Sequence, residues 1–366
     1  MAAGPDGGRV HPRNQLSSWE WITMVLICLQ LPVVLLWAFV KSPFSELGRS
    51  QSWKRVLIDR AMLWLFVNLN RRQIRAVYGE AWGTYHTYMK SKKRDPVVEE
   101  VGEGGKLLWI TSKRADRVIL YVHGGALVFG PFEASLIFWN YIQENLQKRG
   151  KSTGVALMNY SLVPDATFPT QLKQIVLAIQ HLIKSGVTPG NIQLVGDSAG
   201  ALLIHQVLSH ILHPVDGVPK LTLTAPLGGV FMMSPWVITL DDNIYHTNDG
   251  AGDILSASAL LYWGTKIHEG VPPLAKPYLN ATGAPEGWLK GIDKIVKRIL
   301  ISDGAVEVLR DAVIKYSTSV KKYHKNAVLF MQDFGAHDET FIIFFAGEQD
   351  HKLTPFLLDW LDQGFS

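Results

Sequence analysis

Short apolar runs alternate with helical segments from residue 105 to the end of this 366-residue chain. Runs rich in Val, Ile, Leu, Met and Phe have the length and composition of buried strands at 117–122, 154–158, 191–195, 229–233, 298–302 and 327–331. Between several of them, apolar residues recur at helical spacing, over 171–185, 199–212 and 306–320. Strands that alternate with helices predict an α/β fold, with a mostly parallel sheet covered by helices on both faces.

The composition narrows the class of protein further. With 47% hydrophobic and 19% charged residues, the chain is neither disordered nor collagen-like. Its single cysteine, Cys28, excludes a disulfide framework and a cysteine-based metal site. The net charge is only +4, and the basic residues are scattered along the chain, so nucleic-acid binding has little support.

The alternation of strands and helices breaks between residues 240 and 295, where Pro, Gly and Trp are frequent. One helical piece, 257–267, lies within this stretch. We interpret it as a helical cap inserted over the carboxyl edge of the sheet, where the pockets of α/β proteins lie. The catalytic domain is therefore expected to span 105–366.

The run from Trp21 to Val40 contains no charged residue. Twenty helical residues span about 30 Å, which matches the hydrocarbon core of a bilayer. Trp19, Trp21 and Trp37 lie near its ends, where indole rings prefer the membrane interface. We predict a transmembrane anchor over 21–40, preceded by a tail over 1–20.

Two other interpretations of this run remain open, and its orientation is not decided. A cleaved signal peptide would have a shorter apolar region and small residues at its cleavage site, and a buried core helix is the other alternative. Four basic residues follow the run by position 55 and two precede it, which favours a cytosolic body. A glycosylation sequon at Asn280 favours a lumenal one. We expect a single-pass protein of the endoplasmic reticulum membrane, with the side of the catalytic domain undecided.

The segment 50–95 is expected to form amphipathic or cap helices. Val56 to Tyr78 has a broad apolar face interrupted by Arg and Asp, which predicts one amphipathic helix. This helix either packs on the body and caps its pocket or lies on the membrane surface beside the anchor.

The pentapeptide Gly196-Asp197-Ser198-Ala199-Gly200 follows one predicted strand directly and opens a predicted helix. This is the strand–turn–helix context of the G-x-S-x-G nucleophile elbow of α/β-hydrolases. The glycines permit the cramped turn that exposes the serine hydroxyl, and the helix N-terminus favours developing negative charge. We predict that Ser198 is a nucleophile.

A second motif, His123-Gly124-Gly125-Ala126, follows the 117–122 strand. Its small residues let backbone N–H groups approach an oxyanion, together with the amide after the nucleophile. We predict an oxyanion hole formed by Gly124, Gly125 and Ala199. His123 is expected to shape the loop instead of transferring protons, and lipase-like loops carry a further glycine where Ala126 stands.

A serine nucleophile needs a base and an orienting acid, which follow it in the order acid, then histidine. His337 lies in the loop after the last predicted strand, whereas His324 and His351 are expected to be surface residues. The acid follows the 298–302 strand and is either Asp303 or Glu307. Sequence spacing alone does not choose between these two.

Several ordered motifs give the chain a specific resemblance. The His-Gly-Gly and Gly-Asp-Ser-Ala-Gly motifs, with Tyr160-Ser161-Leu162-Val163-Pro164 and Ser234-Pro235-Trp236, resemble the hormone-sensitive-lipase family of α/β-hydrolases over about 105–360. In that family the acid stands two residues before a Leu-Arg-Asp tripeptide, a position that Glu307 occupies here, although most members have aspartate. The N-terminal anchor adds a looser resemblance to membrane-anchored arylacetamide deacetylases and fungal steryl acetyl hydrolases.

The resemblance implies a membrane-bound serine esterase with a Ser198-His337-Glu307 triad that needs no metal and no organic cofactor. Its substrate would be a lipophilic ester, such as an acetylated sterol, and the bilayer would be its other partner. Two alternatives are tailoring of a fungal secondary metabolite by the same chemistry and a non-catalytic ligand-binding protein of the same fold.

Overall fold

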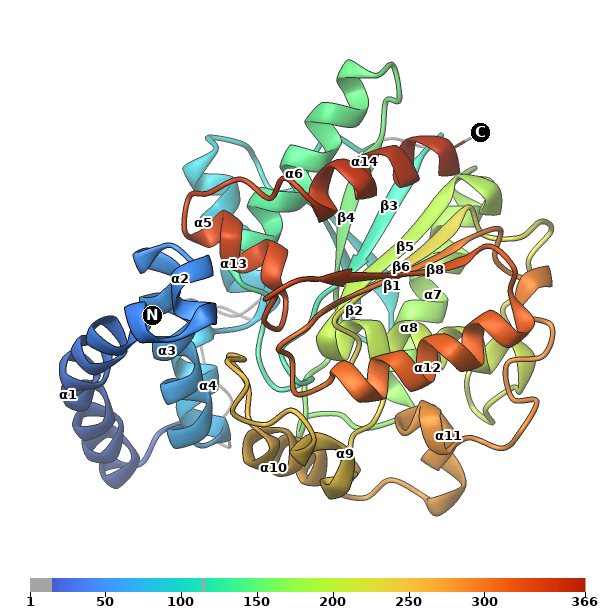
Figure 1. Cartoon of the computed structure of the whole chain (residues 1–366). Coiled ribbons are helices and arrows are strands. Elements are labelled where there is room, and N and C mark those ends of the chain that lie inside the picture. The colour runs from blue at the N-terminus through green and yellow to red at the C-terminus, as the bar shows by residue number, and fades with distance from the viewer. Residues whose placement is uncertain (1–14, 114–115, 366) are drawn as a thin grey trace.

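A mixed β-sheet forms the centre of the computed structural model, which describes residues 15–113 and 116–365 (Figure 1). Its strands are β1 (Val98–Gly102), β2 (Gly105–Trp109), β3 (Val118–Val122), β4 (Gly154–Asn159), β5 (Ile192–Asp197), β6 (Gly229–Met233), β7 (Ile299–Gly304) and β8 (Ala327–Gln332). Their order in the sheet is β1-β2-β4-β3-β5-β6-β7-β8. Strands β3 to β8 are parallel, and β2 is antiparallel to both of its neighbours. The predicted α/β-hydrolase fold with a mostly parallel sheet is confirmed.

Helices cover both faces of this sheet (Figure 1). The helices of the described chain are α1 (Ser18–Lys41), α2 (Glu46–Ser50), α3 (Trp53–Asn68), α4 (Arg71–Tyr78), α5 (Ala81–Ser91), α6 (Glu133–Lys148), α7 (Thr170–Lys184), α8 (Ser198–Leu212), α9 (Asp242–His246), α10 (Ala257–His268), α11 (Lys276–Leu279), α12 (Arg310–Tyr323), α13 (Glu339–Phe345) and α14 (Leu353–Gly364). Helices α6 and α14 pack on one face of the sheet, and α7, α8 and α12 pack on the other. Short 3-10 turns occupy Ser42–Phe44, Pro189–Asn191, Pro273–Ala275, Ala281–Gly283 and Ile292–Lys294.

Side-chain alternation along the strands divides the core into two layers. In β3, Leu120 belongs to the layer packed against α7, α8 and α12, whereas Ile119 and Tyr121 belong to the layer packed against α6 and α14. Every residue of β3 is buried, as expected for a central parallel strand with helices on both sides. Because β3 to β8 are parallel, their carboxyl ends meet at one edge of the sheet.

The six predicted strands are all present, but β1 and β2 were not predicted. β1 reads Val-Glu-Glu-Val-Gly, with charged side chains at its centre, so it lacks the apolar run of a buried strand. The predicted helix over 306–320 instead begins at Arg310. Residues 305–309 form the turn after β7, because the Glu307 carboxylate accepts the Gly304 N–H at 2.6 Å and holds the chain in that turn.

The single helix predicted over Val56–Tyr78 is wrong, because the chain breaks between α3 and α4. Asn70 caps α4, and its side chain accepts the N–H groups of Arg72 and Gln73. The Gln73 side chain in turn accepts the Asn70 N–H at 3.0 Å, which completes a capping box. An Asn at this position favours a new helix start over continuation of α3.

The long apolar helix α1 lies beside α3 (Figure 1). Within the described residues, one helical stretch, Ser18–Phe44, is long and apolar enough to cross a membrane. Most of its apolar side chains are exposed, such as Leu29, Val33 and Leu36, which are 68%, 71% and 64% exposed. Most of the predicted tail over 1–20 lies outside the described residues.

Candidate active site

Ser198 lies at the sharp turn between β5 and α8. Its φ is +48°, a strained left-handed conformation for a residue with a side chain. A Cβ atom on Gly196 would lie 2.8 Å from the Val122 carbonyl oxygen, and one on Gly200 would lie 2.0 Å from the same atom. Glycine is therefore required on both sides of Ser198 because the turn presses against the end of β3.

His337 and Glu307 form a buried hydrogen-bonded pair. His337 Nδ1 lies 2.9 Å from Glu307 Oε2, and both side chains are at most 5% exposed. The other oxygen of Glu307 accepts hydrogen bonds from Ser234 Oγ and Gly304 N, each at 2.6 Å. Between the two acids that the sequence left open, the geometry pairs Glu307, not Asp303, with the imidazole. Asp303 is buried beside Glu307.

Ser198, Glu307 and His337 follow β5, β7 and β8, so the parallel register brings them to the same edge of the sheet. Within the described part of the chain, Ser198 Oγ makes no hydrogen bond to His337 Nε2. That nitrogen instead lies 3.5 Å from Asp338 Oδ2. Such hydrogen bonds are often loose in unliganded enzymes and tighten when substrate binds.

Two residues that sequence reasoning did not assign hold the acid and the histidine in place. Asp253, from the 240–295 insertion, accepts the N–H groups of His337 at 2.8 Å and Val308 at 2.9 Å. Ser234 donates to Glu307 and accepts the Asp338 N–H at 3.1 Å. The Ser-Pro-Trp motif signalled Ser234, but no sequence pattern pointed to Asp253.

The electrostatics of this cluster favour a charged imidazole. Burial opposes protonation of His337, but the surrounding carboxylates, Asp338 first, outweigh it and raise the pKa of the imidazole above its ordinary value. Burial also raises the pKa of Asp253, to about 7, and the charge of Glu307 adds to this shift. A positive charge formed on His337 is therefore well stabilised.

The loop after β3 supplies backbone donors beside Ser198. Gly124 N–H donates to Asp197 Oδ2 at 2.9 Å, so this predicted oxyanion donor has a partner in the structure. Gly125 has φ of +95°, a conformation that glycine adopts without strain. His123 is fully buried, stacks on Tyr160 at 4.4 Å, and has its pKa lowered to about 4 by that burial. It is thus neutral and built into the loop.

The remaining candidates lie away from this cluster. His324 is buried, and its Nε2 lies 2.9 Å from the Val296 carbonyl oxygen, so the prediction of a surface position is wrong. His351 is exposed, as predicted. Asn280 is half-buried, and its side-chain oxygen accepts the Gly283 N–H at 3.1 Å. Its glycosylation stays a prediction.

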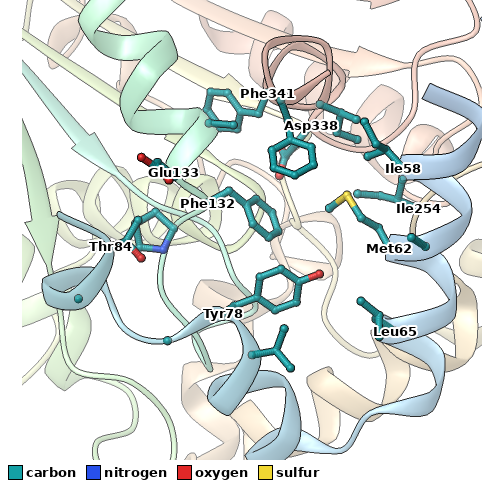
Figure 2. A pocket seen from close by; sticks show the side chains of 18 of the residues that line it. Ile58, Met62, Leu65, Tyr78, Thr84, Phe132, Glu133, Ile254, Asp338 and Phe341 are labelled. Atoms are coloured by element: carbon teal, nitrogen blue, oxygen red, sulfur yellow. The ribbon is translucent and has the colours of Figure 1, made fainter. Parts of the chain in front are cut away.

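A cavity of about 570 Å³ lies next to the chain segment that follows His337 (Figure 2), although Ser198 and His337 themselves are not among its lining residues. Ile58, Met62 and Leu65 of α3 line one side, and Phe132 and Phe341 lie across from them. Asp338 also lines this cavity and is the residue next to His337. The N-terminal helices therefore build one wall of a cavity that reaches the residue after the histidine.

The fold and the site together define the family of this protein. Residues 119–338 match the model of a family described as alpha/beta hydrolase fold. The chain belongs to this family.

Curated relatives match parts of the chain. An acetyl-hydrolase from Streptomyces hygroscopicus is 28% identical over 211 residues, which cover 56% of this chain and 62% of the relative. Over 177 residues, an esterase from Acinetobacter venetianus is 24% identical, covering 47% of this chain and 54% of the relative. An arylacetamide deacetylase from Bos taurus is 32% identical over 118 residues, 30% of this chain and 28% of the relative. The chain therefore spans about three fifths or less of the length of these relatives.

Solved structures share the fold over most of the chain. An esterase from the bacterial hormone-sensitive lipase family superposes with a TM-score of 0.65 at 21% identity, covering 86% of this chain and 99% of that one. An esterase/lipase from an uncultured bacterium gives a TM-score of 0.64 at 22% identity, with the same coverage. At these identities the likeness establishes the fold alone.

Proposed function

We propose that this protein is a serine carboxylic-ester hydrolase with a Ser198-His337-Glu307 triad. The observation that carries the proposal is the 2.9 Å contact between His337 Nδ1 and Glu307, at the sheet edge where Ser198 occupies a strained turn. An acetyl-hydrolase and an esterase among the relatives support this chemistry.

The residues define a two-step reaction. His337 takes the proton of Ser198 as its oxygen attacks the ester carbonyl, and Glu307 holds the ring and stabilises its positive charge. Backbone amides of Gly125 and Ala199, with Gly124 once released from Asp197, stabilise the oxyanion, and one such donor contributes about 3 kcal/mol in related enzymes. His337 then protonates the leaving alcohol, and water releases the acyl group by the same steps.

Within this proposal, the substrate is a lipophilic ester and α1 binds the bilayer. The largely apolar cavity lined by Asp338 suits a bulky apolar group, such as that of an acetylated sterol. The exposed apolar face of α1 suits hydrocarbon, and the length of this helix suits a bilayer. Such a substrate would reach the site from the membrane.

Turnover and flotation test the two parts of the proposal separately. The detergent-solubilised chain is assayed with p-nitrophenyl esters from acetate to long acyl chains, beside Ser198→Ala. We expect turnover by the wild type and none by the variant; equal rates would contradict the proposal. Substitution of Leu29, Val33 and Leu36 with Asp is expected to abolish co-flotation with phosphatidylcholine vesicles, whereas the same change at Ile314 and Val328 should not.

A further inference from the structure

Asp338 combines burial, an incomplete set of partners and a position on the cavity wall. The residue is 3% exposed, and its φ of +54° is one that side chains rarely adopt. Its backbone N–H donates to Ser234, and its Oδ2 faces His337 Nε2 at 3.5 Å. The other oxygen, Oδ1, is buried with no hydrogen-bond partner in the described part of the chain.

Two carboxylates near Asp338, those of Glu307 and Asp253, have hydrogen-bond partners, whereas both oxygens of Asp303 are unpaired like Asp338 Oδ1 in the described part of the chain. Glu307 has three partners, Ser234, Gly304 and His337, and Asp253 accepts three backbone N–H groups. A buried carboxyl oxygen without a donor is costly, and a bound ligand can supply the missing donor. A carboxyl group accepts a hydrogen bond in either protonation state. Asp338, a residue of the cavity wall, therefore has acceptor capacity that a donor entering the cavity can use.

The position of Asp338 indicates which part of an ester lies beside it. In the proposed reaction, His337 Nε2 delivers a proton to the oxygen of the leaving alcohol. A group 3.5 Å from that nitrogen borders the alcohol oxygen. The cavity that Asp338 lines is thus on the alcohol side of the scissile bond, and its other lining is largely apolar, including Met62, Leu65 and Phe132.

From this geometry we infer that Asp338 selects esters whose apolar alcohol carries a hydrogen-bond donor, a hydroxyl or a protonated amine, next to the ester carbon. This inference rests on the proposed function and names the substrate class of the same site. The apolar part of the alcohol fills the cavity between α3 and Phe132, and its donor binds the carboxyl group of Asp338.

Three matched acetates test this selection: 2-hydroxyoctyl acetate, 2-methoxyoctyl acetate and 2-(dimethylamino)octyl acetate. The methoxy ester has the same skeleton and no donor, and the amine separates a cationic preference from a neutral one. We expect the wild type to favour a donor-bearing ester over the methoxy ester in kcat/KM by about tenfold, the effect of one hydrogen bond to a buried acceptor. In Asp338→Asn this ratio should fall below about threefold.

Glu133→Gln is the matched control, because Glu133 is a second carboxylate on the wall of the same cavity but is exposed to solvent. This control should keep the wild-type ratio. A wild type without donor preference, or an Asp338→Asn variant that slows all three esters equally, would overturn the inference. Turnover of p-nitrophenyl acetate is measured in the same samples. If this turnover depends on Ser198, the esterase proposal stands even when the inference about Asp338 fails. If the wild type shows no such turnover, the esterase proposal itself fails.

Discussion

Arg55 of α3 donates to both carboxylate oxygens of Glu339, at 2.7 and 2.9 Å. Glu339 also accepts the N–H of Ala336 at 2.8 Å, and Ala336 directly precedes His337. Asp59, one turn further along α3, forms a second ion pair with Arg55, whose guanidinium nitrogen lies 3.2 Å from the Asp59 carboxylate. The N-terminal helices are thus tied to the loop that holds the proposed catalytic base.

Replacement of Arg55 by Met should destabilise the protein. Arg55 is 2% exposed, and its loss leaves the carboxylates of Asp59 and Glu339 without their cation in a buried setting. Breaking such a pair costs about 3–5 kcal/mol in free energy of unfolding. Denaturant unfolding of the full chain in detergent measures this change in the free energy of unfolding. Arg60→Met, at an exposed position of the same helix, should change stability by less than about 0.5 kcal/mol.

The acid of the triad is tested by a pair of substitutions. Glu307→Gln should lower kcat for p-nitrophenyl acetate by about 10³–10⁴-fold, because an amide cannot stabilise the imidazolium and fixes the wrong tautomer. Asp303→Asn should lower it by less than about tenfold, since the contact of the imidazole is with Glu307. The reverse order would assign the acid to Asp303.

The dependence of activity on pH should reflect the shifted pKa of His337. The neutral imidazole is the base, and the carboxylates raise its pKa, so kcat/KM should still be rising above pH 6.5, the ordinary value for histidine. Asp338→Asn removes the first of these charges and should move the acidic limb to lower pH by about one unit or more. A profile unchanged by the substitution would show that Asp338 does not influence the imidazole.

Filling the cavity should discriminate by substrate size. Met62→Trp adds volume on the α3 wall, so it should reduce kcat/KM for an octyl ester at least tenfold while changing that for methyl acetate by less than threefold. Ile314→Trp, on the exposed face of α12 outside the cavity lining, serves as the matched control. Equal loss on both esters in Met62→Trp would place the alcohol elsewhere.

Patterns within the chain were sufficient to predict the central sheet and the elbow. Six strands coincide with mainly apolar runs, and Ser198 lies between a strand and a helix as its motif requires. β1 was not predicted because the charged residues at its centre are typical of a loop. The helix break at Asn70 was not predicted because the apolar pattern continues across the capping residue.

The support around the histidine could not be predicted, because it depends on contacts between distant segments. Asp253 binds the backbone of His337 from 84 residues away. Arg55 reaches Glu339 across 284 residues. Neither residue lies in a motif, so the spacing of nearby residues does not indicate these partners. The choice between Asp303 and Glu307 likewise needed either the family resemblance or the geometry.

The central claim is that Ser198 carries the acyl group, and active-site labelling followed by peptide mapping tests it most directly. The folded chain in detergent is treated with a fluorophosphonate, and intact mass and the modified peptide are measured for wild type and Ser198→Ala. We predict one adduct per chain, located on Ser198 and lost in the variant. An adduct on another residue, or none on protein whose cooperative unfolding shows that it is folded, would contradict this account.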